Sequence, residues 1–352
     1  MGRTLVVSAL LLLVGCTSPA EEEVTPSPVP TPMEEPPPAP AGRDIEVVLP
    51  PGDRLEDAVT EGLRRRVAAL SAGLPEGVGE LTVRRPDSAP FVVDLAELAA
   101  SRGTGLVCVL GSDTAGTTDT LAQRHRGVRF CGLPTALPEV EEGEELTATP
   151  AVRVELPVAA LGELVGTAAA EVARSSDSDA VVGLVLGGDE LPSGTFRDGL
   201  LVGLAGVEVV EVEDDAAAPA DAVEALLAAG AEVLVVDGHR GAREVVEAVG
   251  DRAVLLGPVD VVDGDDDLDL ALAYRLRHEV ALAAVFDSFG SGALGEVPIL
   301  LGVGDEILDL RVGAGWPELE APLERARTAL AQRDDPRGPV PDGAPAPGPA
   351  EP

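Results

Sequence analysis

The polar residues best suited to binding a small molecule share one position in this chain: each follows a predicted strand at its carboxyl end. These residues are Ser112, Asp113, Gly188, Asp189, Asp237, His239 and Asp260. Carboxylates accept hydrogen bonds from hydroxyl or amino groups, and glycine lets the backbone approach a ligand closely. Because acids repel phosphates, this set suits sugar hydroxyls or amines better than phosphates.

Each of these residues also has a purely structural interpretation, and the sequence leaves both open. Gly188 suits a tight turn after a strand, and Asp189 suits the N-cap of the following helix. Residues 237–241 also read as a polar turn before a helix, and Asp260 as a solvated loop acid. The helix start after Ser112 could hold a carbonyl or anionic group, although the neighbouring acid argues against an anion.

The chain carries no pattern that predicts catalysis. It has no nucleophile elbow and no phosphate-binding glycine loop. Its histidines, His125, His239 and His278, are far apart in the sequence, and no Cys or His spacing typical of a metal site occurs. We therefore predict no enzyme activity, no catalytic residue, no metal and no cofactor.

Alternating strand and helix patterns predict an α/β fold with two doubly wound parallel-sheet lobes. One series of apolar runs comprises residues 180–186, 208–212, 232–236 and 253–256. An earlier series comprises residues 45–49, 80–84, 105–110 and 128–132. Helical patterns separate the runs, and such alternation is typical of parallel sheets covered by helices on both faces. The carboxyl ends of the strands would then face a cleft between the lobes, with Ser112 and Asp113 on one wall and the other polar residues opposite.

We predict three crossovers between the lobes. The N-terminal lobe would comprise residues 43–133 and 262–294, and the C-terminal lobe residues 134–261 and 295–333. The crossovers are expected in the Pro- and Glu-rich stretch after residue 133, in the acidic stretch before residue 270, and near Gly295. On this prediction the strand 151–155 begins the C-terminal lobe, and the strand 270–276 belongs to the N-terminal lobe.

The two ends of the chain are expected to lie outside the fold. Residues 1–15 read as a signal peptide, and Leu13-Val14-Gly15-Cys16 as a lipobox in which Cys16 becomes the lipidated first residue. The alternative is a plain secretory signal with an incidental cysteine. Residues 16–42 and 334–352 are rich in Pro and have little to bury, so we predict a disordered tether and a disordered tail. We expect an extracytoplasmic protein, lipid-anchored to the cell membrane.

Acidic residues dominate the composition. The chain has 62 Asp and Glu against 25 basic residues, all of them Arg, and its net charge is −37. Because a nucleic-acid partner needs a basic face, this balance disfavours one. A solvated acidic surface that keeps the protein soluble is one explanation of the excess, and a cationic ligand is the alternative.

Two cysteines, Cys108 and Cys131, fall in consecutive predicted strands. A disulfide between them is chemically allowed outside the cytoplasm. Strand neighbours often direct their Cβ atoms past each other, however, so two separate buried thiols are the alternative. The sequence leaves this choice open.

Four stretches of the chain resemble the basic membrane protein (BMP) family, the purine-nucleoside-binding lipoproteins of ABC importers. They are residues 161–166 (LGELVG), 182–188 (VGLVLGG), 229–234 (AGAEVL) and 306–310 (EILDL). The resemblance covers residues 44–332 and implies a type I periplasmic-binding-protein fold. It also implies that Phe196 contacts the ligand and that Asp260 contacts a ribose, with a small-molecule solute and an ABC permease as partners.

The chain departs from the family at the ligand motifs. Residues 50–55 (PPGDRL) stand where the family has an Asp-Asp-Gly or Ser-Phe-Asn stretch, the family's Lys is missing, and aromatic residues are few. Two hypotheses follow. The first is a membrane-anchored lipoprotein that binds a small polar, nucleoside-like solute for an ABC importer. The alternative is a degenerate relative that acts as an extracytoplasmic sensor or scaffold without solute transport.

Overall fold

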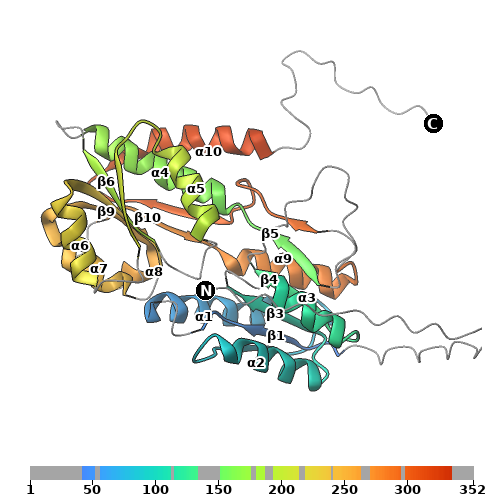
Figure 1. The fold of residues 1–352 in the computed structure, drawn as a ribbon. Helices are drawn as coiled ribbons and strands as arrows, with labels where there is room; N and C mark the ends of the chain where they lie inside the picture. Colours follow the sequence, from blue (N-terminus) through green and yellow to red (C-terminus); the bar gives the residue numbers. More distant parts are fainter. Residues whose placement is uncertain are drawn as a thin grey trace, which may run out of the picture. The chain divides into compact units, whose positions relative to one another are not determined.

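The protein forms two six-stranded sheets flanked by helices (Figure 1). The computed structural model describes residues 42–51, 56–111, 115–133, 151–175, 180–186, 193–213, 219–238, 241–262, 270–294 and 298–334. Every statement about structure below concerns these residues. The predicted α/β fold class is confirmed.

The first sheet has the strand order β11-β5-β4-β3-β1-β2, and every pairing in it is parallel. Its strands are β1 (Ile45–Val48), β2 (Leu81–Arg84), β3 (Leu106–Leu110), β4 (Arg129–Leu133), β5 (Val152–Glu155) and β11 (Ile299–Leu300). The helices of this lobe are α1 (Asp57–Ala69), α2 (Pro90–Ser101), α3 (Ala115–Arg124) and α9 (His278–Ser291), with the 3₁₀ turn η1 (Leu70–Gly73) after α1.

Alternating side chains of β1 face opposite helix layers. Ile45 and Val47 are buried in one cluster with residues of α1 and α9, and Val48 is buried in another with residues of α2 and α3. Because both faces of the sheet are covered, its central strands are mostly apolar on both sides, which explains the long apolar runs in the sequence.

The second sheet has the order β12-β10-β9-β8-β6-β7, and β12 alone among its described strands runs antiparallel to its neighbour. Its strands are β6 (Val181–Leu186), β7 (Val209–Glu213), β8 (Ala231–Val236), β9 (Val254–Pro258), β10 (Leu270–Leu276) and β12 (Leu308–Val312). The helices of this lobe are α4 (Val158–Ser175), α5 (Ser193–Gly203), α6 (Pro219–Ala228), α7 (Ala242–Val249), α8 (Val259–Val262) and α10 (Glu320–Asp334), with the 3₁₀ turns η3 (Gly250–Arg252) and η4 (Pro317–Leu319).

The two sheets share one winding order. Read from the β2 edge, the first sheet runs β2-β1-β3-β4-β5, and the second runs β7-β6-β8-β9-β10 in the same pattern. In each sheet the order of the strands reverses once, between β1 and β3 and between β6 and β8. Such switch points are where open α/β sheets bind ligands, outside the carboxyl ends of the strands.

The chain crosses between the lobes three times, as predicted. The first crossover joins β5 to α4, the second joins β10 to α9, and the third joins β11 to β12. Helix α9 packs with α1 in the first lobe, whereas α4 packs with α5 and α10 in the second.

Three strands lie in a different sheet from the one predicted. Strand β5 was expected in the C-terminal lobe but pairs with β4 in the first sheet. Strand β11 also joins the first sheet, and β10 joins the second rather than the first. The predicted sheet was wrong for these strands because a Pro- and Glu-rich stretch and an acidic stretch were each interpreted as a crossover. Periodicity identifies a strand, but it contains no information about which sheet the strand joins.

Helices α4 and α5 approach each other at backbone contact through two pairs of glycines. A Cβ atom on Gly162 would lie 2.1 Å from the carbonyl oxygen of Phe196, and one on Gly199 would lie 2.0 Å from that of Ala159. Gly166 and Gly203 make equivalent approaches. Glycine is therefore required at this crossing, and it determines how close α5 lies to the rest of the second lobe.

Cys108 and Cys131 form a disulfide. They are register partners on the neighbouring strands β3 and β4, with Cα atoms 4.6 Å apart, and both side chains are fully buried. The bond links the two strands at their middle residues. Among the described helices, none combines the length and the apolar character needed to cross a membrane.

Candidate functional site

The structure describes three of the predicted site residues. Phe196, Asp237 and Asp260 belong to the described part of the chain. The other predicted residues, Cys16, Ser112, Asp113, Gly188, Asp189 and His239, lie outside it. Their roles stay predictions.

Asp237 stands at the switch point of the second sheet. It follows β8 directly, its backbone N–H donates to the carbonyl oxygen of Val185 on β6 at 3.2 Å, and only 2% of the residue is exposed. The backbone hydrogen bond fixes the residue between the two strands where the order reverses. A carboxylate is thereby placed at the edge where a doubly wound sheet binds its ligand.

Phe196 packs inside the second lobe. Its ring stacks on that of Tyr274, with centroids 5.7 Å apart, and both residues are almost fully buried. The hydroxyl of Tyr274 donates to the carbonyl oxygen of Val236, the residue before Asp237, at 2.8 Å. The aromatic pair therefore supports the end of β8. Ligand contact by Phe196 stays a prediction that would require the ring to leave this packing.

Asp260, in α8, is paired with arginines. Its two carboxylate oxygens accept hydrogen bonds from Arg66 at 2.5 and 2.7 Å, and Arg275 lies 3.7 Å away. Only 6% of the residue is exposed. Both oxygens are occupied by a cation from the first lobe, so ribose contact by Asp260 would require this pair to open.

Glu56 is a residue at this edge that sequence reasoning missed. Its backbone N–H donates to the carbonyl oxygen of Gly238 at 3.2 Å, and its carboxylate accepts from the N–H of Gly241 at the same distance. Glu56 precedes α1 in the first lobe, and the two glycines follow β8 in the second. The only signal in the sequence was an acidic residue just before a helical pattern, which is common.

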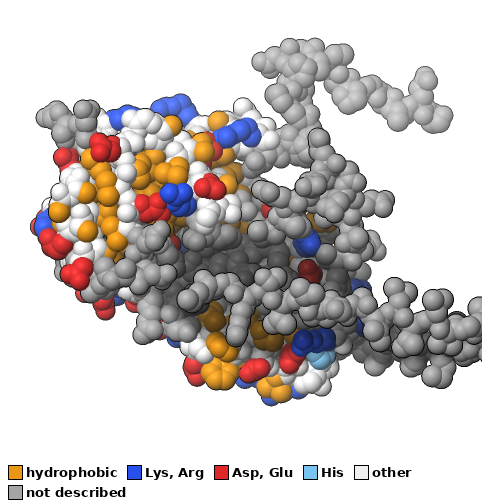
Figure 2. Space-filling view, viewed as in Figure 1, with side chains coloured by type: hydrophobic (Ala, Val, Ile, Leu, Met, Phe, Trp, Pro, Cys, Tyr) orange, Lys and Arg blue, Asp and Glu red, His pale blue; other side chains and the backbone are white. Residues whose placement is uncertain are grey.

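The arginines of the surface are largely used in ion pairs. Pairs shorter than 3 Å join Arg64 to Glu61, Arg85 to Asp57, Arg124 to Glu97, Arg197 to Glu211 and Arg252 to Glu224. Figure 2 shows acidic and basic side chains interspersed with apolar ones over the described surface on the face in view. Within the described residues, no group of three or more His, Cys, Asp or Glu is placed to hold a metal ion.

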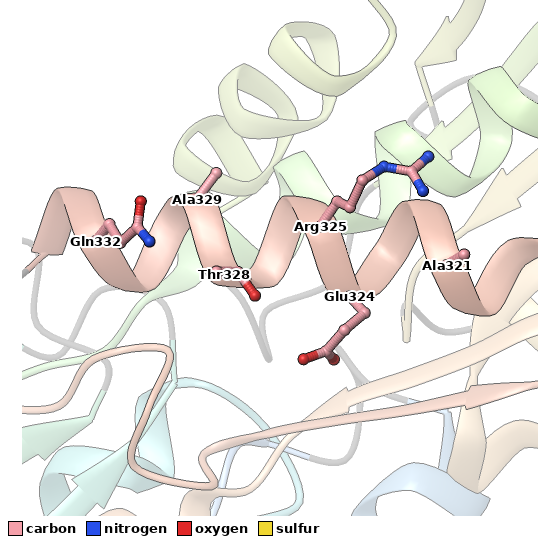
Figure 3. A pocket seen from close by; sticks show the side chains of 6 residues that line it. All are labelled: Ala321, Glu324, Arg325, Thr328, Ala329 and Gln332. Carbon is pink, nitrogen blue, oxygen red and sulfur yellow. The ribbon is translucent and has the colours of Figure 1, made fainter.

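A groove lies on the outer face of α10, away from the strand ends. Its volume is about 470 Å³, and it is lined by Ala321, Glu324, Arg325, Thr328, Ala329 and Gln332 (Figure 3). All of these residues come from one exposed face of a single helix. A binding site in such a fold gathers polar groups from several elements, so this groove is not the candidate site.

Two doubly wound lobes of the same winding order, joined by three crossovers, define the type I periplasmic-binding-protein fold. Solved structures agree. A solute-binding protein of an ABC transporter system from Aeropyrum pernix K1 is similar with a TM-score of 0.60 at 18% identity, over 82% of this chain and 86% of that one. A periplasmic solute-binding protein of an ABC transporter from Actinobacillus succinogenes 130z, with bound D-allose, has a TM-score of 0.57 at 13% identity, over 81% and 99%.

A third similar structure has a different kind of name. A transcriptional activator of the comK gene from Bacillus halodurans has a TM-score of 0.58 at 15% identity, over 82% of this chain and 96% of that one. No family model matches this chain, and the search of curated proteins gave no match. At these identities the likeness establishes the fold alone, because one fold supports several functions. Membership of the BMP family stays a prediction.

Proposed function

We propose that this protein binds a small polar solute between its two lobes and delivers it to an ABC permease. The observation that carries the proposal is the buried carboxylate of Asp237 at a switch point of a type I periplasmic-binding-protein fold. Two structurally similar proteins are named as ABC solute-binding proteins, and one of them holds D-allose. The role is one of binding and not of catalysis.

We propose that the solute carries a sugar. A carboxylate accepts hydrogen bonds from vicinal hydroxyls, which monosaccharides and nucleosides share. The resemblance to the BMP family favours a nucleoside, and the bound D-allose of one similar protein favours a free sugar. The proposed wall comprises Gly188, Asp189, Asp237 and His239, with Ser112 and Asp113 opposite.

A thermal-shift screen tests this function. A ligand that binds only the folded form stabilises that form and therefore raises the melting temperature. The stabilisation grows with the ratio of the ligand concentration to Kd. We expect a nucleoside or a monosaccharide such as D-allose to raise it, and glucose 6-phosphate or a nucleotide to have no effect. A rise with phosphorylated compounds alone would contradict the proposed solute class.

Substitution of Asp237 tests the site. We expect Asp237→Ala to weaken solute binding by about 1–3 kcal/mol, the cost of leaving a buried hydrogen-bond partner unsatisfied, which is roughly a 5- to 150-fold loss of affinity. Asp251→Ala is the matched control, because Asp251 is an exposed acid of the same lobe, in η3. Equal affinities of the two variants would contradict the site.

We also propose that the protein is extracytoplasmic and held on the membrane by lipid on Cys16. Cys16→Ser should release the protein into the aqueous phase of a detergent phase separation or leave its signal peptide uncleaved. Unchanged partition into the detergent phase, with a mature N-terminus, would contradict the anchor.

A second candidate function is a sensor or scaffold that has lost solute binding and transports no solute. The observation that favours it is the Bacillus halodurans structure, which has the same fold and is named as a transcriptional activator. The screen separates the two candidates, because a pure scaffold would show no shift with any solute.

A further inference from the structure

Helix α1 of the first lobe packs directly against the second lobe. Contacts join α1 to α8, which lie side by side in Figure 1. Val59 of α1 is fully buried in an apolar cluster that otherwise consists of second-lobe residues, among them Val245 and Val261. This turn of α1 therefore contributes a side chain to the apolar core of the second lobe.

Close approach at this contact depends on Gly62. A Cβ atom there would lie 2.6 Å from a carboxylate oxygen of Asp260. One turn later on the same helix, Arg66 forms a two-pronged pair with that carboxylate, at 2.5 and 2.7 Å. The side chains of Arg66 and Asp260 are only 17% and 5% exposed. Such a pair is shielded from water and salt far more than a surface pair.

The Arg66–Asp260 pair lies in the middle of a chain of alternating charges that spans both lobes. On the second-lobe side, Arg275 lies 3.7 Å from Asp260 and 2.8 Å from Asp309. On the first-lobe side, Glu279 of α9 lies 3.5 Å from Arg66. Arg275 and Glu279 flank the crossover from β10 to α9, so the chain of charges surrounds one of the hinges between the lobes.

A second contact joins the lobes near the strand ends. The N–H and carboxylate of Glu56 bond to the backbone of Gly238 and Gly241, as described above. The contacts of Glu56, Val59, Gly62 and Arg66, which we call the α1 latch, therefore extend over the first three turns of one helix. None of them involves a solute.

We propose that the α1 latch holds the two lobes together in the absence of solute, with Arg66–Asp260 as its principal contact. To open the lobes at α1, the protein must separate two nearly buried charges, and removal of one partner leaves the other uncompensated. The latch thereby sets the fraction of molecules whose cleft is open. Its effect on solute uptake rests on the proposed function, whereas the latch itself does not.

Distances between the lobes test the latch directly. Spin labels at Asp94→Cys on α2 and Asp198→Cys on α5, both exposed positions in different lobes, report the separation by double electron–electron resonance without added solute. We expect one short distance in the labelled parent protein and a shift of the main peak to longer distance in Asp260→Asn. Arg64→Gln is the matched control, because it removes an exposed ion pair from the same helix.

A second variant tests the latch if Asp260→Asn does not fold. Arg66→Lys keeps the charge but cannot form the two-pronged pair, so it should give a smaller shift in the same direction. Circular dichroism establishes that each variant is folded. Distance distributions of folded Asp260→Asn and Arg66→Lys that match the parent would overturn the latch, whether or not any solute binds.

With a solute from the thermal-shift screen, the latch makes a second prediction. Because the closed state binds solute and the open state admits it, Arg66→Lys should lower the affinity while raising the association rate. Failure to find a solute would contradict the proposed function and leave the distance result intact. Longer distances combined with unchanged affinity and association rate would restrict the latch to a structural role and overturn its effect on uptake.

Discussion

The glycine contact between α4 and α5 gives the most direct test of how the second lobe is packed. Gly199→Ala places a Cβ atom 2.0 Å from the carbonyl oxygen of Ala159 and 3.0 Å from its Cα. Contacts below 3.0 Å are essentially never seen for real Cβ atoms. Helix α5 must therefore retreat by about 1 Å from α4, which also loosens the reciprocal contact at Gly162.

The expected loss of stability in Gly199→Ala follows from two opposing effects. Overpacking against a backbone that cannot rotate away costs about 3 kcal/mol, and alanine regains about 1 kcal/mol of helix propensity. We expect a net destabilisation of about 2 kcal/mol. Gly194→Ala on the same helix is the matched control, because no atom of the described residues, apart from its own chain neighbours, lies within 4 Å of its Cβ position. This control should lose no stability.

Urea unfolding measures the difference in stability between Gly199→Ala and Gly194→Ala. Trp316, the single tryptophan, stands directly before η4 in the second lobe, so its fluorescence reports the lobe that contains the contact. A Gly199→Ala variant as stable as Gly194→Ala would refute the backbone contact between the helices. Since α5 carries Phe196, which stacks on Tyr274 under the end of β8, the same variant should also reduce solute affinity.

Two further predictions concern stability. Replacing Cys108 and Cys131 by alanine should lower the free energy of unfolding by about 3 kcal/mol, the loop-closure contribution for a separation of 23 residues, and an unchanged urea midpoint would contradict it. Complete burial lowers the pKa of His278 from 6.5 to about 4, so the unfolded state binds more protons between these values. The contribution of neutral His278 to the free energy of unfolding is therefore complete above about pH 6.5. It declines by up to about 3 kcal/mol as the pH falls to 4. His278→Gln should flatten the pH dependence of unfolding in this window, and equal slopes for the two proteins would contradict the burial.

Sequence periodicity was sufficient to predict the fold class. The predicted strand at residues 180–186 is β6, Val181–Leu186, and the predicted strand at 45–49 is β1, Ile45–Val48. A strand covered on both faces is largely apolar, so its pattern is visible in the residues themselves. The number of crossovers was also predicted correctly, although the strands at which they occur were not.

Sheet membership and the ion pairs could not be predicted in the same way. Strands β5 and β10 join sheets other than those expected, because the partner of a strand depends on contacts distant in the sequence. Arg66 and Asp260 are 194 residues apart, and nothing in the sequence distinguishes Arg66 from the two arginines before it. Phe196 looked like a ligand residue by resemblance, whereas its position against Tyr274 depends on how α5 packs.

Isothermal titration calorimetry of the parent protein and Asp237→Ala tests the central claim most directly. We predict that at least one nucleoside or monosaccharide found in the thermal-shift screen binds the parent protein with one site per chain. We further predict that Asp237→Ala loses roughly 5- to 150-fold in affinity while Asp251→Ala does not. Binding heats that are absent for every nucleoside and monosaccharide tested, or unchanged in Asp237→Ala, would contradict a solute site at the end of β8.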